Sequence, residues 1–442
     1  MNFILALLSI LLMTVIGFSI IKFLNVFEKR SGYEILPYAF GLGAGVASLQ
    51  LYLYSRVGAP WQLGLITAPW IVVVLACFFR WKLAISKQKI MGKNSLVEKL
   101  LLIAIGILII FVTLESQMRP VTAWDGWSSW LLRAKMFFIE KGVTPGTFAY
   151  IPSEYPVAVS LMSTFLYLFM GKLDDKSVLL LYPAFYIALG LLFFSSLTLI
   201  TGKKIALLFT FLLLSIQNVI RHSGRFEAGQ ADIILGFYAF ASLMLFSLYS
   251  KVKNLKTLLL LQMFLVITSL IKDDGISLVL FIQGILLFLI LKRKSYTHLL
   301  LFVVWLLPFI EWQLFKTKLV LPSAPSYIGN TLHLDRIPLI FVEFAKEFLN
   351  IGNWNLVWIA FAISVVIYIT SIKRNLRYLP YYGIVIFQIC VYAGVFLVTS
   401  PDPHHHIPNV INRAFLHIVP IAMFAVAANT AIIKGKLKND KI

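Results

Sequence analysis

Residues 98–116 read EKLLLIAIGILIIFVTLES, and this apolar stretch decides the fold class. A helix needs about 20 residues, at about 1.5 Å each, to cross a hydrocarbon core about 30 Å thick. Within that core every backbone amide must be paired inside its own segment, which favours helices. Similar runs recur throughout the 442 residues, of which 60% are hydrophobic and 13% charged. We therefore predict an all-α, polytopic transmembrane protein with a single integral membrane domain, 1–442.

The Lys and Arg residues, which give a net charge of +20, lie mainly in short hinges between the apolar runs. They act as topology signals, so no nucleic-acid partner is expected. Every hinge can be placed on the cytoplasmic side. About thirteen transmembrane helices then run from an outside N-terminus, with the first helix retained, to an inside C-terminus. The predicted spans are 2–22, 33–55, 61–79, 98–116, 177–200, 205–221, 231–249, 257–271, 276–291, 299–315, 354–372, 379–398 and 413–433.

Two further apolar or amphipathic segments are predicted to be interfacial helices in the outer loops. Residues 157–171 would form a helix of only about 22 Å, too short for an upright span. We expect it to lie on or dip into the outer leaflet. Residues 338–350 place Glu343 and Glu347 on a polar side, opposite several phenylalanines.

The longest segment between predicted spans is 117–176, and Trp124-Asp125-Gly126-Trp127 lies near its start. Arg133 and Lys135 follow, and Glu154-Tyr155-Pro156 comes near the end of the loop. A carboxylate beside cations suits base catalysis next to a phosphate. An aromatic belt at the membrane boundary, with Asp125 capping a helix, explains the same residues, and both interpretations stay open.

Two more polar groups interrupt the apolar runs. The polar stretch 221–232 ends at Asp232, where a helix begins, so Asp232 is either an N-cap or a second acid facing the same outer cavity. Lys272-Asp273-Asp274-Gly275 divides two short apolar arms and is expected to lie below the outer headgroups. Charges at that depth usually belong to a binding site, although a Lys272–Asp273 pair that only shapes the turn is the alternative.

The last polar group is Pro401-Asp402-Pro403-His404-His405-His406, followed by Asn412-Arg413. Adjacent histidines in an extended loop point in different directions, so we favour a solvated or phosphate-contacting loop over a metal site. Arg413 is expected at a helix start, where it would oppose the helix dipole and need an anionic partner.

In their order and spacing these motifs resemble the GT-C superfamily of integral-membrane glycosyltransferases, which includes protein O-mannosyltransferases and aminoarabinose transferases of lipid A. In that family a helix exits to the outer face and leads into a large loop with an aromatic-flanked Asp, as at Asp125. The resemblance covers about 98–433, the expected GT-C-like core. Within it 117–176 is the catalytic outer loop, and 1–97 adds N-terminal helices. The other matching elements are Arg133 with Lys135, Glu154-Tyr155-Pro156, Ala231-Asp232, Lys272-Asp273-Asp274-Gly275 and Asn412-Arg413.

The resemblance implies an inverting glycosyltransferase of the cytoplasmic membrane whose active site faces the extracytoplasmic side. A sugar would move from a polyprenyl-phosphate-linked donor to an envelope glycan, lipid or protein acceptor, with Asp125 as general base. The donor phosphate would be bound by Arg133, Lys135, Lys272 and Arg413. The acceptor, or one of the cations, would be oriented by Asp232, Glu154 and Tyr155.

Two other functions remain open from the sequence. A flippase or transporter of lipid-linked glycans would need charge along a path open to both sides. An O-antigen-type polymerase or ligase would use Arg and His in outer loops, as at His404–His406. No cofactor is required by the pattern. A divalent cation stays open, but Asp125 with Asp232 is too small a ligand set to predict a metal site.

Overall fold

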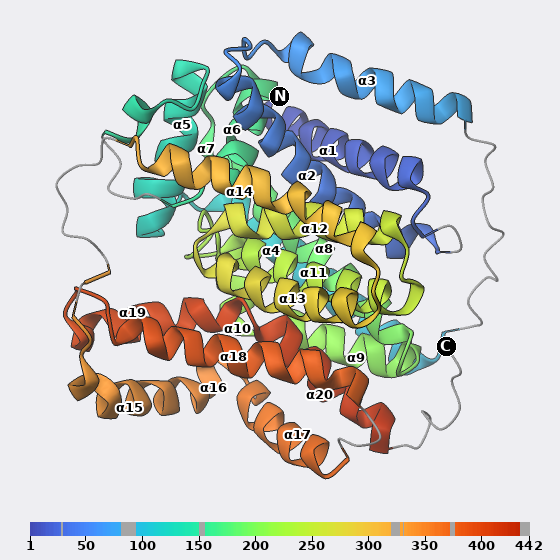
Figure 1. The fold of residues 1–442 in the computed structure, drawn as a ribbon, viewed down its shortest axis with the longest axis vertical. Coiled ribbons are helices and arrows are strands. Elements are labelled where there is room, and N and C mark those ends of the chain that lie inside the picture. Colours follow the sequence, from blue (N-terminus) through green and yellow to red (C-terminus); the bar gives the residue numbers. More distant parts are fainter. Residues whose placement is uncertain are drawn as a thin grey trace.

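The computed structural model describes residues 1–27, 30–80, 94–149, 155–319, 328–329, 331–371 and 376–433. Within these ranges the regular structure is helical, and one isolated β-bridge joins Ile328 to Thr399. The all-α prediction is confirmed for this part of the chain. Figure 1 shows α1–α3 at one end of the long axis, α15–α20 at the other, and α8 and α11–α13 between them.

The α-helices are α1 (Asn2–Leu24), α2 (Gly32–Arg56), α3 (Leu63–Arg80), α4 (Leu96–Met118), α5 (Leu131–Glu140), α6 (Ala158–Met170), α7 (Asp175–Val178), α8 (Leu181–Thr198), α9 (Lys203–Leu214), α10 (Gln217–Gly224), α11 (Asp232–Val252), α12 (Leu255–Ile271), α13 (Asp274–Lys292), α14 (Phe302–Lys316), α15 (Ile337–Phe348), α16 (Ile351–Trp354), α17 (Val357–Ser371), α18 (Leu379–Phe396), α19 (Pro403–Leu416) and α20 (Val419–Ile433).

Helices occur at all thirteen predicted spans, and eight of them are long and apolar enough to cross a membrane. Two more, α9 with α10 and α19 with α20, pass the same test as pairs that bend by 66° and 52°. The remaining three, at 61–79, 257–271 and 354–372, are shorter apolar helices. The described residues therefore form a helical membrane protein with eight to ten candidate spans, and the full count of thirteen stays a prediction.

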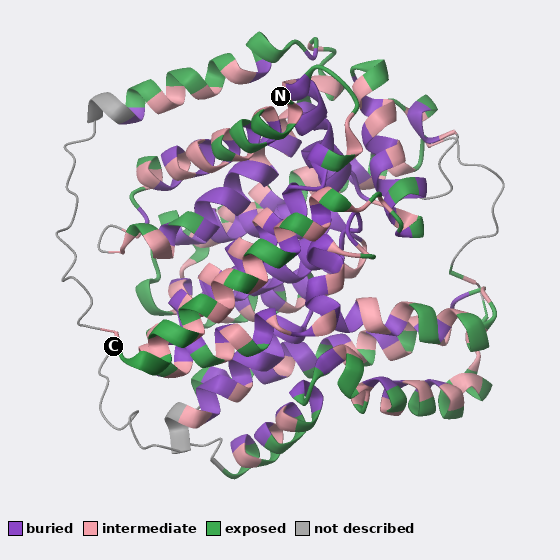
Figure 2. Cartoon of the chain, turned by 180° about the vertical axis from the view of Figure 1, so that it is seen from behind, coloured by how far each residue is buried: buried purple, intermediate pink, exposed green. Residues whose placement is uncertain are grey.

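The centre of the bundle is formed by α8 and α11, whereas α4 lies at its surface. In the apolar window of α11, 83% of the residues are buried, against 6% for α4. Figure 2 shows the buried residues gathered in the middle of the molecule and the exposed ones on the outer helices. Because α11 also packs on α12, α13, α19 and α20, the residue at its start meets several helices at once.

The segment 157–171 differs from the expected interfacial helix. It forms α6, and all but one of its thirteen residues are buried. It packs against α1, α2, α5 and α12. The prediction of a helix on the leaflet surface is wrong here because a helix that is apolar all round can be enclosed by other helices.

The second predicted interfacial helix is present as α15, but its sides differ from the expectation. Phe341 is exposed, whereas Glu347 is buried and accepts a hydrogen bond of 2.6 Å from the indole nitrogen of Trp354. Phe344 is also buried, against Phe415. Glu347 therefore holds α15 to α16 instead of facing water.

Two contacts show which helix ends lie together. Lys203, at the start of α9, donates to Asn94, just before α4. From that end α4 runs to Met118, which precedes Asp125, and α9 leads through α10 towards Asp232. The charged residues at Asp125 and Asp232 consequently lie at the opposite end of the bundle from Lys203.

Candidate functional site

Asp125 stands at the entrance of a short π-helical turn, Gly126–Trp130, which continues into α5. Single π-turns occur often at functional sites because they displace side chains from the regular helical spacing. The side chain of Asp125 caps no helix in this structure. Trp124 and Trp127 pack edge to face at 4.7 Å, and both remain exposed. The side chain of Asp125 is therefore partly accessible at the start of the π-helical turn.

The segment before this turn is held against the loop that precedes α11. The hydroxyl of Thr122 donates to the carbonyl of Phe226 over 2.9 Å. Gly229 has a φ of +105°, and a Cβ atom there would lie 3.3 Å from the Cα of Gly126. Glycine suits this backbone conformation and this close approach. Two segments about 100 residues apart are thus fixed side by side.

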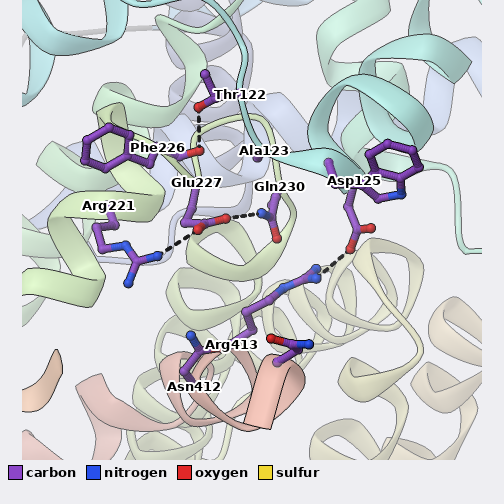
Figure 3. Close-up of a pocket in the computed structure, with 11 residues that line it drawn as sticks. Thr122, Ala123, Asp125, Arg221, Phe226, Glu227, Gln230, Asn412 and Arg413 are labelled. Carbon is purple, nitrogen blue, oxygen red and sulfur yellow. Dashed lines mark hydrogen bonds and ion pairs between the residues drawn. The ribbon is translucent and has the colours of Figure 1, made fainter. Parts of the chain in front are cut away.

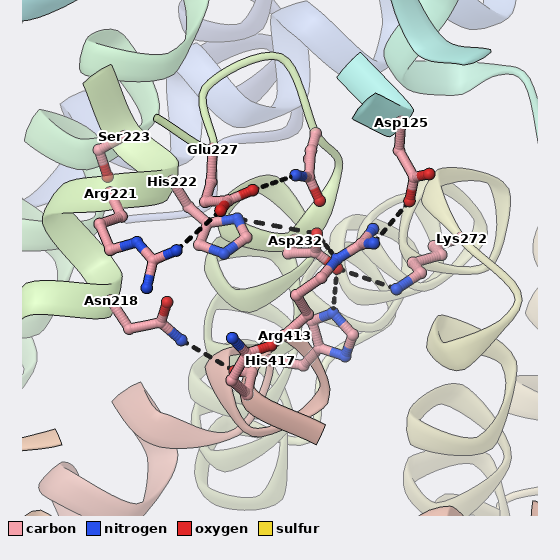
Figure 4. A network of polar contacts seen from close by, with 12 residues as sticks. Asp125, Asn218, Arg221, His222, Ser223, Glu227, Asp232, Lys272, Arg413 and His417 are labelled. Atoms are coloured by element: carbon pink, nitrogen blue, oxygen red, sulfur yellow. Dashed lines mark hydrogen bonds and ion pairs between the residues drawn. The ribbon is translucent and has the colours of Figure 1, made fainter. Parts of the chain in front are cut away.

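Asp125 is paired with Arg413, which comes 288 residues later. The Nη1 atom of Arg413 lies 2.5 Å from Oδ2 of Asp125, and its Nε atom lies 3.1 Å from Oδ2 of Asp232. One guanidinium therefore joins both acids, as Figure 4 shows. Arg413 lies in the last turn of α19 and not at a helix start as predicted. A cation in that position is favoured by the helix dipole, so the dipole argument for a required anion was wrong.

Asp232 is the centre of the cluster. Its side chain is 0% exposed, and Oδ1 accepts from Nζ of Lys272 and contacts Nε2 of His417, each at 2.9 Å. The side chain makes no cap hydrogen bond at the start of α11, which excludes the N-cap interpretation. A buried carboxylate requires such partners, because burying an unpaired charge is very costly.

Two histidines surround this carboxylate. His417 contacts the hydroxyl of Tyr392 through Nδ1 at 2.7 Å, which links Asp232 to α18. His222, from α10, is also buried, and its Nδ1 lies 3.8 Å from Oδ2 of Asp232. Neither ring nitrogen of His222 has a hydrogen-bond partner among the described residues. The distance of 3.8 Å is too long for a hydrogen bond, so His222 borders Asp232 without holding it.

The turn between α12 and α13 supplies Lys272, as its sequence predicted. Nζ of Lys272 lies 2.9 Å from Asp274 as well as 2.9 Å from Asp232. Burial alone would lower the pKa of Lys272, but the two carboxylates outweigh burial and hold this pKa above its usual range. Asp273 lies 3.8 Å from Lys316, and Lys272 pairs with Asp274, so the alternative of a Lys272–Asp273 pair that only shapes the turn is wrong.

A cavity of about 470 Å³ adjoins this cluster, with Asp125 and Arg413 on one side and Arg221 and Glu227 on the other (Figure 3). Arg221 and Glu227 form a second ion pair of 2.8 Å, and Gln230 donates to Glu227 over 2.5 Å. The lining residues are Thr122, Ala123, Trp124, Asp125, Arg221, Phe226, Glu227, Gln230, Asn409, Asn412 and Arg413.

This lining combines aromatic rings, amides and two balanced ion pairs. Such surroundings suit a polar ligand with several hydroxyl groups, because amides and ion-paired side chains both donate and accept hydrogen bonds. Asp232 and Lys272 do not line the cavity. Asp232 contacts Arg413, which does line it, and Lys272 contacts Asp232.

Arg133 and Lys135 lie elsewhere than at the cavity. Arg133 is fully buried between α5 and α6, where it donates to the carbonyl of Tyr155 and, over 3.1 Å, to Ser160. Burial lowers its pKa to about 9, which still leaves it charged at neutral pH. Lys135 pairs with Asp175 at 2.6 Å. Neither residue lines the cavity in which a donor phosphate was expected.

Tyr155 lies beside the cluster, and Glu154 falls outside the described residues. The ring of Tyr155 stacks on Trp130, with centroids 5.2 Å apart and planes at 12°. Burial raises the pKa of Tyr155, while the nearby charge of Lys272 opposes this. Its hydroxyl is therefore neutral at ordinary pH and can act as a hydrogen-bond donor or acceptor.

The three consecutive histidines form the first turn of α19 and not an extended loop. The backbone amide of His404 donates to Asp402, and Pro403 stands at the first helical position. Among the described residues no group of three or more His, Cys, Asp or Glu side chains could hold a metal ion.

The sequence prediction gave no role to five residues that line the cavity, which are Arg221, Glu227, Gln230, Asn409 and Asn412. The polar stretch 221–232 was recognised, but only its last residue was given a role. An Arg and a Glu six residues apart in the sequence give no sign of a cavity until the fold brings α19 opposite them.

Comparisons with protein-family models, curated proteins and solved structures found no match to this chain. The resemblance to the GT-C superfamily therefore rests on the motifs alone.

Proposed function

We propose that this chain is an inverting, GT-C-type membrane glycosyltransferase. It transfers a sugar from a polyprenyl-phosphate-linked donor to a glycan, lipid or protein acceptor, and Asp125 is the general base. The observation that carries the proposal is the meeting of Asp125, Asp232, Lys272 and Arg413 beside one cavity. These four residues come from separate motifs that span 288 positions, and ion pairs join them into one cluster.

The chemistry requires a base and a cationic site for the leaving group. Asp125 takes the proton from an acceptor hydroxyl or amine, whose oxygen or nitrogen attacks the anomeric carbon from the face opposite the phosphate. The bond from that carbon to the phosphate oxygen breaks, and the electron pair leaves with the lipid phosphate. Arg413, held in place by Asp232, is the cation that stabilises this charge, and Lys272 contacts the same Asp232 carboxylate.

The distribution of charge supports an extracytoplasmic site in the cytoplasmic membrane. The hinges 22–34, 80–99, 203–204, 251–256, 292–294, 373–377 and 434–441 hold 24 of the 39 Lys and Arg and 4 of the 19 Asp and Glu. The rest of the chain carries 15 of each, so the entire net charge of +20 belongs to these hinges. Loops enriched in Lys and Arg stay in the cytoplasm, and the cluster lies at the opposite end of α4, α11 and α13.

The test is turnover of a panel of radiolabelled polyprenyl-phosphate sugars by purified protein in lipid extract. We expect labelled product from the wild type and a loss of about 10²- to 10⁴-fold in Asp125→Asn, the range for general-base catalysis. Asp335→Asn is the matched control, because this exposed carboxylate does not line the cavity.

Equal sugar release by wild type and Asp125→Asn would contradict the role of Asp125. Labelled lipid that crosses the bilayer with its sugar bond intact would instead identify a flippase.

A further inference from the structure

The two carboxylates that contact Arg413 differ in burial, so one of them can be replaced by another anion and the other cannot. Its Nε atom is fixed by Asp232, which is 0% exposed and has further contacts with Lys272 and His417. Its Nη1 atom contacts Asp125, whose side chain is 24% exposed and lines the cavity. Asp125 can therefore leave Arg413 without leaving a buried charge unpaired, whereas Asp232 cannot.

The pairing of Asp125 with Arg413 also conflicts with the role proposed for each residue. The oxygen of Asp125 that accepts from Nη1 is occupied by that contact, so it is not available to take a proton from an acceptor. The same contact occupies the guanidinium edge that faces the cavity, where a phosphate would bind. The structure thus represents a state in which base and phosphate site neutralise each other.

The local charge shows what an incoming phosphate would meet. Asp125, Asp232 and Asp274 carry three negative charges, against two positive charges on Lys272 and Arg413. With neutral histidines this group has a net charge of −1. A phosphate added beside Asp125 would be repelled by the carboxylate. A phosphate that replaces Asp125 on Arg413 leaves the guanidinium with two anionic partners, as before.

We propose that the Asp125–Arg413 ion pair is a latch that the donor phosphate opens. The phosphate takes the Nη edge of Arg413, and the displaced carboxylate turns to the acceptor. The donor must therefore bind before the acceptor can be deprotonated, so the base is released only when a sugar is present to receive the attack. This mechanism rests on the proposed function and adds an order of binding to it.

The latch predicts that removing the charge of Asp125 strengthens phosphate binding while it lowers the rate of sugar transfer. The experiment measures the affinity of the detergent-solubilised protein for farnesyl phosphate and for farnesol, by calorimetry. We expect Asp125→Asn to bind farnesyl phosphate about 3- to 10-fold more tightly than the wild type, since a partly exposed ion pair contributes about 1 kcal/mol and tenfold corresponds to about 1.4 kcal/mol. Farnesol affinity should not change.

Two controls isolate the effect. Asp335→Asn removes an equal charge from an exposed position outside the cavity and should leave both affinities unchanged. The second control is made in the background of Arg413→Lys, which keeps the positive charge but loses the planar guanidinium group. There the gain in farnesyl phosphate affinity from Asp125→Asn should shrink below about twofold, because Asp125 and the phosphate no longer compete for the same guanidinium nitrogens. Asparagine matches aspartate in shape, so Asp125→Asn remains decisive even if the Arg413 variant fails to fold.

Failure of the latch and failure of the proposed function give different results. If farnesyl phosphate binds better than farnesol but Asp125→Asn gains nothing or loses affinity, the latch is wrong and the phosphate site stands. Equal affinity for both probes in every variant overturns the latch and the donor class together. Phosphate binding that tightens in Asp125→Asn, without sugar transfer by the wild type, supports the latch and contradicts the transferase.

Discussion

Replacement of Asp232 by Asn removes the carboxylate on which the cluster is built. Asp232 is fully buried, and its two oxygens lie within 3.1 Å of donors on Lys272, Arg413 and His417. The amide of Asn keeps the shape of the side chain but presents one oxygen and no charge. Lys272 retains Asp274, and Arg413 retains Asp125, so the variant leaves each cation with one carboxylate instead of two.

The magnitude follows from this geometry. Because each cation keeps one carboxylate, no charge is left unpaired, and the cost is that of hydrogen bonds lost between charged groups, about 1.5–3 kcal/mol. With an unfolding entropy of about 2.1 cal/mol/K per residue, 1 kcal/mol corresponds to about 1 °C for 442 residues, so we expect Tm to fall by about 1.5–3 °C. Asp125→Asn removes only a partly exposed pair, worth about 1 kcal/mol or less, and should lower Tm by about 1 °C at most.

The assay is thermal unfolding in detergent, followed by tryptophan fluorescence. A second variant that combines Asp232→Asn with Lys272→Met tests the cause, because removal of the more deeply buried of the two cations should recover part of the loss. If Asp232→Asn melts within about 1 °C of the wild type, or no lower than Asp125→Asn, the buried cluster does not have the charge structure described.

Three further predictions concern packing and the residues outside the cavity. Gly43→Ala should destabilise the protein by about 1–3 kcal/mol because the new Cβ would lie 1.6 Å from the carbonyl of Met13, whereas Gly106→Ala, with nothing within 4 Å, should be neutral or slightly stabilising in the same melting assay. Lys135→Ala should lower stability by about 1 kcal/mol at most, because Lys135 forms a partly exposed ion pair with Asp175. Donor affinity should stay within about twofold of the wild type, and a tenfold loss would show that Lys135 does contact the donor phosphate. Gln283→Leu should cost about 1–3 kcal/mol because it leaves the buried amide of Gln262 without its reciprocal partner, and adding Gln262→Leu should restore most of this, as measured by Tm.

Much of the fold could be predicted from the sequence, because apolar runs of sufficient length have one stable form in lipid. Residues 96–118 and 232–252 are helices near their predicted bounds, and the turn at Lys272 divides α12 from α13 as expected. The environment of each helix was harder to predict. Length indicated that 157–171 does not cross upright, but whether lipid or protein surrounds it depends on helices elsewhere in the chain.

The sequence at the start of α19 carries a local signal for a helix. Asp402-Pro403 is a typical helix beginning, with an acidic cap followed by Pro at the first helical position. Recognition of this signal would have placed the three histidines on a helix, where successive side chains are about 100° apart. It would also have placed Arg413 near the end of that helix, about three turns later.

The cations were harder to assign than the acids, because nearness to Asp125 in the sequence says little about access to a ligand. Arg133 is eight residues from Asp125, yet it is enclosed by α5 and α6 and holds the backbone of Tyr155. Lys135 forms an ion pair with Asp175. A cation is open to an anionic substrate only if its present partner can be exchanged. Arg413 meets this condition because one of its two carboxylates, Asp125, borders the cavity while Asp232 keeps the guanidinium in place.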